Sequence, residues 1–279
     1  MQCPACRRTF PLERGVWRFV DSEHYSGSFG YQWNRFARTQ LDSATGTARS
    51  RDAFVEKTGW ALEDLRGKTV LDAGCGMGRF AEVCADVGAE VVGIDLSSAV
   101  DAAAQNLRHR SNVTICQADI LNTPFRPGTF DFIYSLGVLH HTPDTRRAFL
   151  SLVPLLKPGG RIAIWVYWDR LARLYPGSEL LRPITSRLSK PVLVQLSRVA
   201  VPLYWLHRVP VVGRLTSAVL PTSMNPDPDW RTLDTFDWYS PRYQWKHSDE
   251  QVRGWFGEAG LVDLVTGPFK VSVSGRMPL

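Results

Sequence analysis

The sequence predicts an α/β fold built on a mostly parallel sheet, and three observations support this. Thr69–Ala73 reads as a buried strand that runs into a glycine turn and then a helix. Short apolar strands and helical stretches then alternate as far as residue 167. Acidic residues occur at the ends of three successive strands, at Asp72, Asp95 and Asp119. Open parallel sheets bind ligands at the carboxyl ends of their strands, so the pattern predicts a ligand site at that edge.

The individual elements follow from local signals. Gly88 turns the chain into the second strand, and Ser97 and Ser98 are suitable N-caps for the helix that follows it. Gly260 ends the last predicted helix. The expected strands are 69–73, 90–95, 113–118, 129–135, 161–167, 261–265 and 271–274, and the main helices between them are 78–87, 97–110, 144–155 and 249–258.

Composition is that of an ordinary globular protein. The 279 residues are 44% hydrophobic and 22% charged, which is enough for one substantial core and an appendage. The first residues are polar, and no stretch approaches the roughly 20 apolar residues of a membrane span. The five cysteines are an odd number, which favours free thiols over a disulfide framework. We therefore expect a cytoplasmic protein.

The formal net charge of +6 comes from one segment. Residues 165–221 contain eight Lys or Arg and two acids, so of the totals of 33 and 27 the rest of the chain holds 25 of each. A basic excess confined to one segment points to a local partner or substrate and not to a property of the whole fold.

The glycine turn carries the most specific motif. Gly74, Gly76 and Gly78 have the spacing G-x-G-x-G, and Arg79 stands where a dinucleotide fingerprint has its third glycine. Asp72 precedes the turn, and a carboxylate there suits a cofactor with an ammonium or sulfonium group better than a pyrophosphate. Asp95 follows Gly74 at the distance of a residue that accepts hydrogen bonds from ribose hydroxyls, which fits an adenosine cofactor of either class.

These residues resemble the class I S-adenosylmethionine-dependent methyltransferases of the type 11-like group, whose first motif is (D/E)-x-G-x-G-x-G. The turn L-K-P-G-G at residues 156–160 matches that group as well. The resemblance covers roughly 23–279. It implies a Rossmann-like seven-stranded mostly parallel sheet with an antiparallel last strand, plus a helical insertion.

The resemblance also implies site residues. Asp119 would accept from the adenine amine, Leu96 would lie against the adenine face, and the N-terminal helix would close over the amino-acid end of the cofactor with candidates Tyr25, Gln32, Trp33 and Arg35. The full set implied for S-adenosyl-L-methionine is Asp72, Gly74, Cys75, Gly76, Gly78, Asp95, Leu96, Asp119, Ile120, Ser135, Leu136 and Arg35. His140 is the candidate catalytic base. No metal is required.

Five segments are expected along the chain. They are a zinc-ribbon-like remnant (1–22), a helical lid (23–66), the cofactor-binding core (67–167), an insertion over the substrate pocket (168–245) and a closing helix with strands (246–279). The remnant resembles the second half of a zinc-ribbon module found ahead of some methyltransferases. Its single C-x-x-C pair, Cys3 and Cys6, supplies only half of a zinc site, so either the metal has been lost or the chain starts downstream of the true beginning.

The insertion has two interpretations. Apolar residues at 192, 193, 196, 199, 200 and 203 have the spacing of one helix face, with arginines between them. We favour a cap over the substrate pocket, because insertions at this point cover the ligand edge of the sheet. An amphipathic membrane or partner surface at 191–219 is the alternative, and packing on the domain would also explain the stripe.

The predicted function is transfer of a methyl group from S-adenosylmethionine to an oxygen, nitrogen or carbon of a small-molecule acceptor. An RNA methyltransferase, an NAD-dependent oxidoreductase and a non-catalytic cofactor-binding module are the alternatives. Against RNA, the arginines of the insertion alternate with apolar residues and lack clustered stacking aromatics. DNA is not expected as a partner. The sequence does not identify the acceptor or the oligomeric state.

Overall fold

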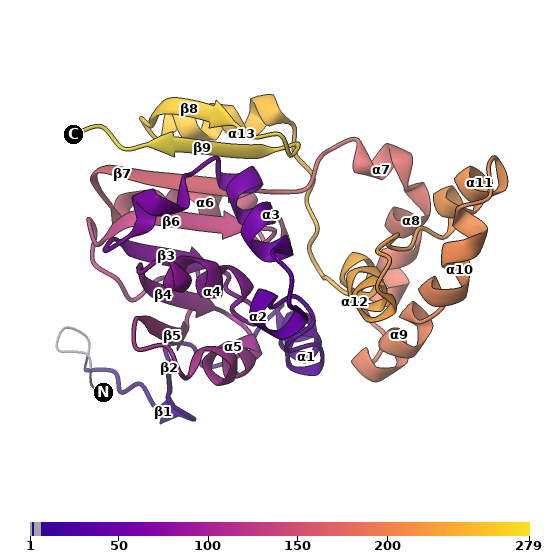
Figure 1. Cartoon of the computed structure of the whole chain (residues 1–279), viewed down its shortest axis with the longest axis horizontal. Coiled ribbons are helices and arrows are strands. Elements are labelled where there is room, and N and C mark those ends of the chain that lie inside the picture. Colours follow the sequence, from indigo (N-terminus) through magenta and orange to yellow (C-terminus); the bar gives the residue numbers. More distant parts are fainter. Residues whose placement is uncertain (1, 3–6) are drawn as a thin grey trace.

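The computed structural model describes residues 2 and 7–279, and its centre is a mixed sheet (Figure 1). In the described residues nine strands follow the order β1-β2-β5-β4-β3-β6-β7-β9-β8. Only β1 and β9 run against the others. The strands are β1 (Leu12–Glu13), β2 (Val16–Arg18), β3 (Thr69–Ala73), β4 (Glu90–Asp95), β5 (Val113–Gln117), β6 (Phe130–Leu136), β7 (Leu156–Trp165), β8 (Val262–Thr266) and β9 (Ser272–Arg276). The seven strands from β5 to β8 confirm the predicted sheet, including its antiparallel last strand.

Helices cover both faces of this sheet. One face packs on α3 (Arg49–Thr58), α4 (Arg79–Asp86) and α5 (Ala99–Leu107). The other packs on α6 (Thr145–Leu152) and α13 (Asp249–Glu258). The period-2 alternation of the strands divides their side chains between the two layers, so Val70 belongs to the first and Leu71 to the second. Short 3₁₀ turns occur at η1 (Leu62–Leu65), η2 (Leu139–His141) and η3 (Val153–Leu155).

The N-terminal segment extends the sheet, which the sequence did not predict. Strand β2 pairs in parallel with β5, and Arg18 fixes this edge because its buried guanidinium contacts Asp101 at 2.5 Å and Gln117 at 3.2 Å. The part of residues 1–22 that the structure describes is therefore attached to the cofactor-binding core. The cysteine pair of the expected zinc-ribbon remnant, Cys3 and Cys6, lies outside the described residues.

The remaining helices gather at the carboxyl edge of the parallel strands. Figure 1 shows an insertion beyond the end to which those arrows point, with α1 (Gly27–Arg35) and α2 (Asp42–Thr45) beside it. The insertion contains α7 (Leu171–Leu174), α8 (Pro176–Thr185), α9 (Lys190–Ser197), α10 (Ala200–His207), α11 (Val212–Val219) and α12 (Pro228–Tyr239). No described helix is long and apolar enough to cross a bilayer.

The apolar stripe predicted across 192–203 does not form one helix face. The chain breaks between α9 and α10, because Pro202 has no N–H to donate to the carbonyl of Arg198 and its ring crowds that carbonyl. Leu193 and Ala200 are buried, whereas Val192 and Leu196 are exposed. The spacing-based prediction was wrong because it assumed a continuous helix.

Candidate active site

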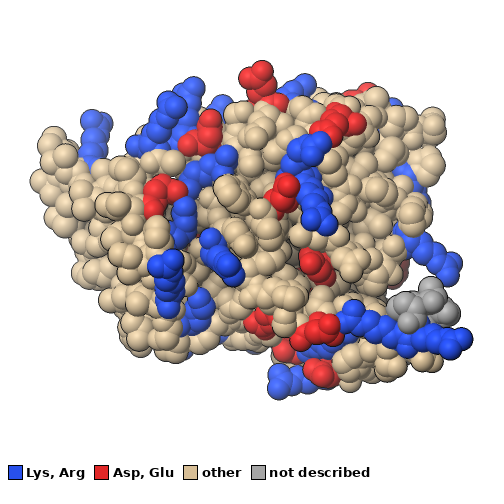
Figure 2. All heavy atoms as spheres, turned by 180° about the vertical axis from the view of Figure 1, so that it is seen from behind, with Lys and Arg blue, Asp and Glu red and all other residues tan. Residues whose placement is uncertain are grey.

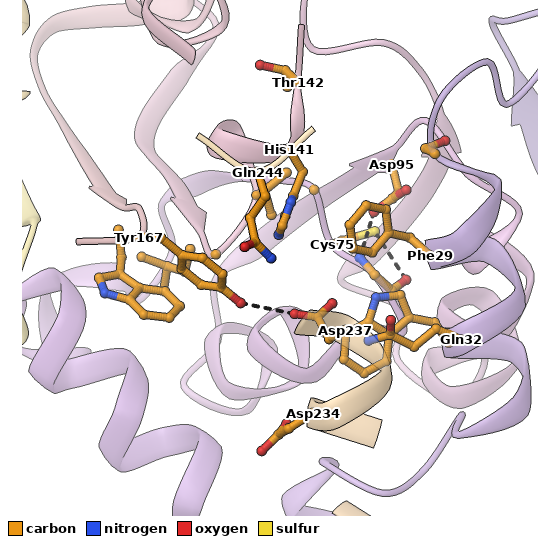
Figure 3. A pocket seen from close by; sticks show the side chains of 18 of the residues that line it. Phe29, Gln32, Cys75, Asp95, His141, Thr142, Tyr167, Asp234, Asp237 and Gln244 are labelled. Carbon is orange, nitrogen blue, oxygen red and sulfur yellow. Dashed lines mark hydrogen bonds between the residues drawn. The ribbon is translucent and has the colours of Figure 1, made fainter. Parts of the chain in front are cut away.

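A cavity of about 510 Å³ lies at the carboxyl edge of the sheet. Its walls come from the glycine turn after β3, the ends of β4 and β5, helix α1, and helices α8 and α12 of the insertion. Figure 3 shows side chains from these elements turned toward one space. Segments more than 150 residues apart therefore meet around a single volume.

The glycine turn brings backbone to the cavity wall. Gly74 has φ 92°, and a Cβ built there would lie 2.4 Å from Cγ1 of Val138. A residue with a side chain would therefore be strained and would collide with the loop after β6. The amides of Gly74 and Cys75 both donate to the carbonyl of Ile94, at 2.8 and 2.9 Å, so the turn is tied to the end of β4. Cys75 and Gly76 line the cavity, and Gly78 does not.

Asp95 joins two of these walls. Its carboxylate accepts hydrogen bonds from the Gly76 amide at 3.0 Å and from the amide and hydroxyl of Ser97 at 2.8 and 2.7 Å. Burial raises the pKa of Asp95, and these three donors act in the opposite direction. Asp95 lines the cavity together with Asp119, whose Oδ1 accepts from the Leu121 amide at 2.9 Å.

The apolar residues expected near adenine are also present. Leu96, Ile120 and Leu136 line the same cavity as Asp95 and Asp119. The structure thus brings together two carboxylates and an apolar slot, which is the combination that ribose hydroxyls and a purine ring require.

Other predicted cofactor residues do not reach the cavity. Asp72 is 2% exposed and lies in the layer beneath the turn, where its alternating strand position directs it toward Tyr134. Burial raises the pKa of Asp72 to about 7, and a hydrogen bond with Tyr134 acts to lower it. Ser135 is likewise buried and donates to the carbonyl of Ala73 at 2.7 Å. Neither side chain lines the cavity, and their contacts with a cofactor stay a prediction.

Arg35 is also displaced from its predicted place. It ends α1 on the exposed side, with its guanidinium 5.8 Å from the ring of Phe36. The helix itself does close over the cavity, because Phe29, Gln32 and Trp33 line it from the opposite face. Arg35 does not line the cavity, because its position on the helix directs its side chain to the exposed side.

Two other residues that line the cavity have a buried polar atom without a partner in the part of the chain that the structure describes. Gln32 is 1% exposed, and its Oε1 has no hydrogen-bond partner among the described residues. Nε of Arg79 is also without one, although an Nη atom of the same guanidinium donates to Gln40. Both residues line the cavity, and each has one buried polar atom without a partner among the described residues. Arg79 entered the sequence argument only as a departure from the dinucleotide motif.

His140 is fully buried and does not line the cavity. Its ring lies 4.1 Å from that of His141 and 4.0 Å from that of Tyr167, and neither ring nitrogen has a partner among the described residues. Burial holds its pKa well below the usual range. His141 does reach the cavity, with Nδ1 2.8 Å from the carbonyl of Tyr243. The geometry therefore gives the predicted base at His140 no direct access to a ligand.

Helix α12 supplies two carboxylates that the sequence did not single out. Asp237 accepts a hydrogen bond from the hydroxyl of Tyr167 at 3.0 Å, as drawn in Figure 3. Asp234, one turn earlier, accepts from the hydroxyl of Ser223 at 3.0 Å. Burial raises the pKa of Asp234 to about 7. Both residues line the cavity on the side away from Asp95.

Aromatic rings and a buried lysine complete that side. Trp165, Trp230 and Trp238 line the cavity, and Nζ of Lys57 lies 3.7 Å from the ring centroid of Trp165. Burial and the charge of Arg79 lower the pKa of Lys57 to about 7. Among the described residues no group of three or more His, Cys, Asp or Glu is arranged to hold a metal ion.

The central part of the chain is similar to a known protein family. Residues 71–164, from β3 to β7, match the family Methyltransf_11, described as a methyltransferase domain. The segment from β3 to β7 is therefore similar to methyltransferase domains. The matched segment holds the glycine turn, Asp95 and Asp119, and the insertion lies outside it.

Characterised relatives are methyltransferases of small molecules. The chloroplastic tocopherol O-methyltransferase of Arabidopsis thaliana is 39% identical over 128 residues, 43% of this chain and 36% of that protein. The norajmaline N-methyltransferase of Rauvolfia serpentina is 26% identical over 66% of this chain and 64% of that protein. The chain thus spans less than two thirds of either relative.

One solved structure supports the fold. A possible exported protein from Bordetella parapertussis has a TM-score of 0.51 and 18% identity, over 88% of this chain and 72% of that one. At this identity the likeness concerns the chain's fold and not its chemistry.

Proposed function

We propose that the protein transfers a methyl group from S-adenosylmethionine to an oxygen or nitrogen of a small-molecule acceptor. The observation that carries this proposal is the single cavity with two chemically different ends. One end has Asp95 and Asp119 beside an apolar slot, and the other has Asp234 and Asp237 among aromatic rings. A nucleoside-type cofactor and a second molecule can therefore meet in one cavity.

The residues present fit this cofactor. Asp95 would accept from the ribose hydroxyls and Asp119 from the adenine amine. Arg79 and Gln32 line the cavity, and their polar side chains would hold the carboxylate and the ammonium of the amino-acid end. When bound, the cofactor supplies a methyl group already activated by a positively charged sulfur.

The chain's own contribution is to orient the acceptor and take up its proton. Tyr167 donates to one oxygen of Asp237 and holds that carboxylate at the cavity wall. Its other oxygen is free to accept the proton that an O–H or N–H nucleophile loses as the methyl bond forms. The indole rings of Trp165 and Trp238 would hold a flat or apolar acceptor and exclude water.

We also propose, against the RNA alternative, that the acceptor is small, because α12 and its aromatic side chains line the far side of the cavity. Among the described residues Cys75, Cys84 and Cys116 are free, buried thiols, which is compatible with a cytoplasmic location.

Asp237→Asn tests the assignment of the acceptor end. The purified chain would be incubated with methyl-labelled S-adenosylmethionine and a panel of phenols and amines, and label transfer would be counted. We expect the variant to bind the cofactor normally and to lose about 100-fold in kcat, since a positioned base contributes at least that much. Asp229→Asn, an exposed residue on the same helix, is the matched control and should keep full activity.

Two outcomes would contradict the proposal separately. Equal transfer by Asp237→Asn and the original chain would remove Asp237 from the reaction and leave the methyltransferase assignment standing. A chain that binds S-adenosylmethionine but transfers its methyl group to no member of the panel would instead favour a non-catalytic binding module.

A further inference from the structure

The outward surface of the insertion is unusually apolar. Of the 22 large hydrophobic side chains that are exposed among the described residues, 14 lie within residues 174–219. We call these 14 side chains the outer face; the most exposed include Leu180 at 78%, Trp205 at 70% and Leu215 at 67%. Monomeric soluble proteins rarely leave a contiguous surface of this kind uncovered.

The outer face is distinct from the cavity although it uses the same helices. On α8, Ser178 is buried and lines the cavity, whereas Leu180 and Ile184 point outward. Helix α11 packs tightly against α8, because a Cβ on Gly177 of α8 would lie 1.8 Å from the carbonyl oxygen of Val219. The exposed side chains are therefore presented by packed helices.

The same segment is strongly basic. Residues 171–220 contain seven Lys or Arg and one acid, Glu179, which already pairs with Arg182 at 2.6 Å and with Lys246. Four exposed arginines, Arg187, Arg198, Arg208 and Arg214, form no ion pair with any described residue. Figure 2 shows this end of the molecule at its left, with blue side chains standing among large uncharged areas.

We propose that the outer face docks on an anionic lipid surface. Apolar side chains flanked by unpaired arginines match a membrane interface, where the former enter the acyl boundary and the latter meet phosphate groups. A second copy of the chain is the poorer occupant, because its residues 171–220 would bring seven further Lys or Arg and no unpaired acid. None of the described helices can span a bilayer, so the insertion would lie on the surface.

Vesicle cosedimentation tests this proposal with the full chain. We expect binding to vesicles of phosphatidylcholine with phosphatidylglycerol, little binding to phosphatidylcholine alone, and release in 0.5 M salt. The double variant Trp205→Ser, Leu215→Ser should bind about tenfold more weakly, since two large apolar side chains no longer enter the interface. Val265→Ser removes a side chain that is 54% exposed on β8, far along the chain from the insertion, and should bind normally.

A second variant measures how much the arginine charges contribute to vesicle binding, apart from the apolar side chains. Arg198→Gln, Arg214→Gln should weaken binding to the anionic vesicles by about fivefold for each charge removed and leave the fold intact, because both side chains are exposed. Equal binding to neutral and anionic vesicles, or binding that both double variants retain, would overturn the proposal. So would self-association in analytical ultracentrifugation that the Trp205→Ser, Leu215→Ser variant abolishes, in a chain that sediments with no vesicle.

Discussion

Asp234 is a buried carboxylate that forms no ion pair with the described residues. Burial raises its pKa from an ordinary value near 4 to about 7 in the folded protein. The unfolded chain releases this proton at lower pH than the folded chain does. Folded Asp234 therefore costs stability progressively as pH rises between these two values.

Asp234→Asn should remove this pH dependence. Relative to the variant, the original chain should lose on the order of 2 kcal/mol of unfolding free energy between pH 4.5 and pH 8. Urea unfolding at several pH values measures the difference, and every other titrating group is common to both proteins. For the control Asp229→Asn, exposed on the same helix, the difference in unfolding free energy from the original chain should not change with pH. A flat difference for Asp234→Asn as well would show that this carboxyl titrates normally.

Residues differ in how well the sequence predicts them. Asp95 and Asp119 were predicted because parallel strands bring their carboxyl ends to one edge, so topology alone places them. Asp72 and Arg35 do not line the cavity, because strand alternation and helix rotation decide which way a side chain points, and their cofactor contacts stay a prediction. Asp234 was missed because it enters the cavity only through packing of α12, a helix far along the chain from the glycine motif.

At the level of elements, the glycine turn is the part of the site with the least freedom. Gly74→Ala places a methyl group against Val138 at a backbone φ of 92°, so we expect a loss of about 1–3 kcal/mol in stability and weaker cofactor binding. Thermal unfolding and cofactor titration measure the two effects. Gly254→Ala is the matched control, since it lies inside α13 with nothing within 4 Å and should be neutral or stabilising by up to about 1 kcal/mol. Equal stability and equal cofactor affinity of the two variants would contradict the close approach of Gly74 to Val138.

Element prediction succeeded where local signals were strong. Strand β3 has the predicted ends, Thr69 and Ala73, because a buried apolar run and a glycine turn coincide there. The stripe over 192–203 failed because Pro202 interrupts a helix that periodicity alone would continue. Strands β1 and β2 were not predicted, since runs of two and three residues carry no readable alternation.

At the scale of the whole molecule, the two sides of the insertion differ in their surroundings. Its inner side lines the cavity with Ser178, Asp234 and Asp237, and its outward side carries exposed apolar and basic side chains. The seven-stranded, mostly parallel sheet with its antiparallel last strand followed from the resemblance, because several motifs occur in the expected sequence order. The outer face could not be predicted, because the spacing of apolar residues does not say which of them remain exposed after packing.

The central claim is that the cavity binds S-adenosylmethionine through Asp95, and calorimetric titration of the purified chain tests it most directly. We predict binding of S-adenosylmethionine, no binding of NAD, and a loss of about 1–3 kcal/mol of cofactor affinity in Asp95→Ala, whose ribose hydroxyl partners would be left unpaired. Asp131→Ala, which removes a carboxylate bonded to Lys157 and the Thr69 amide outside the cavity, should leave the affinity unchanged. Binding of NAD with no binding of S-adenosylmethionine would contradict the account.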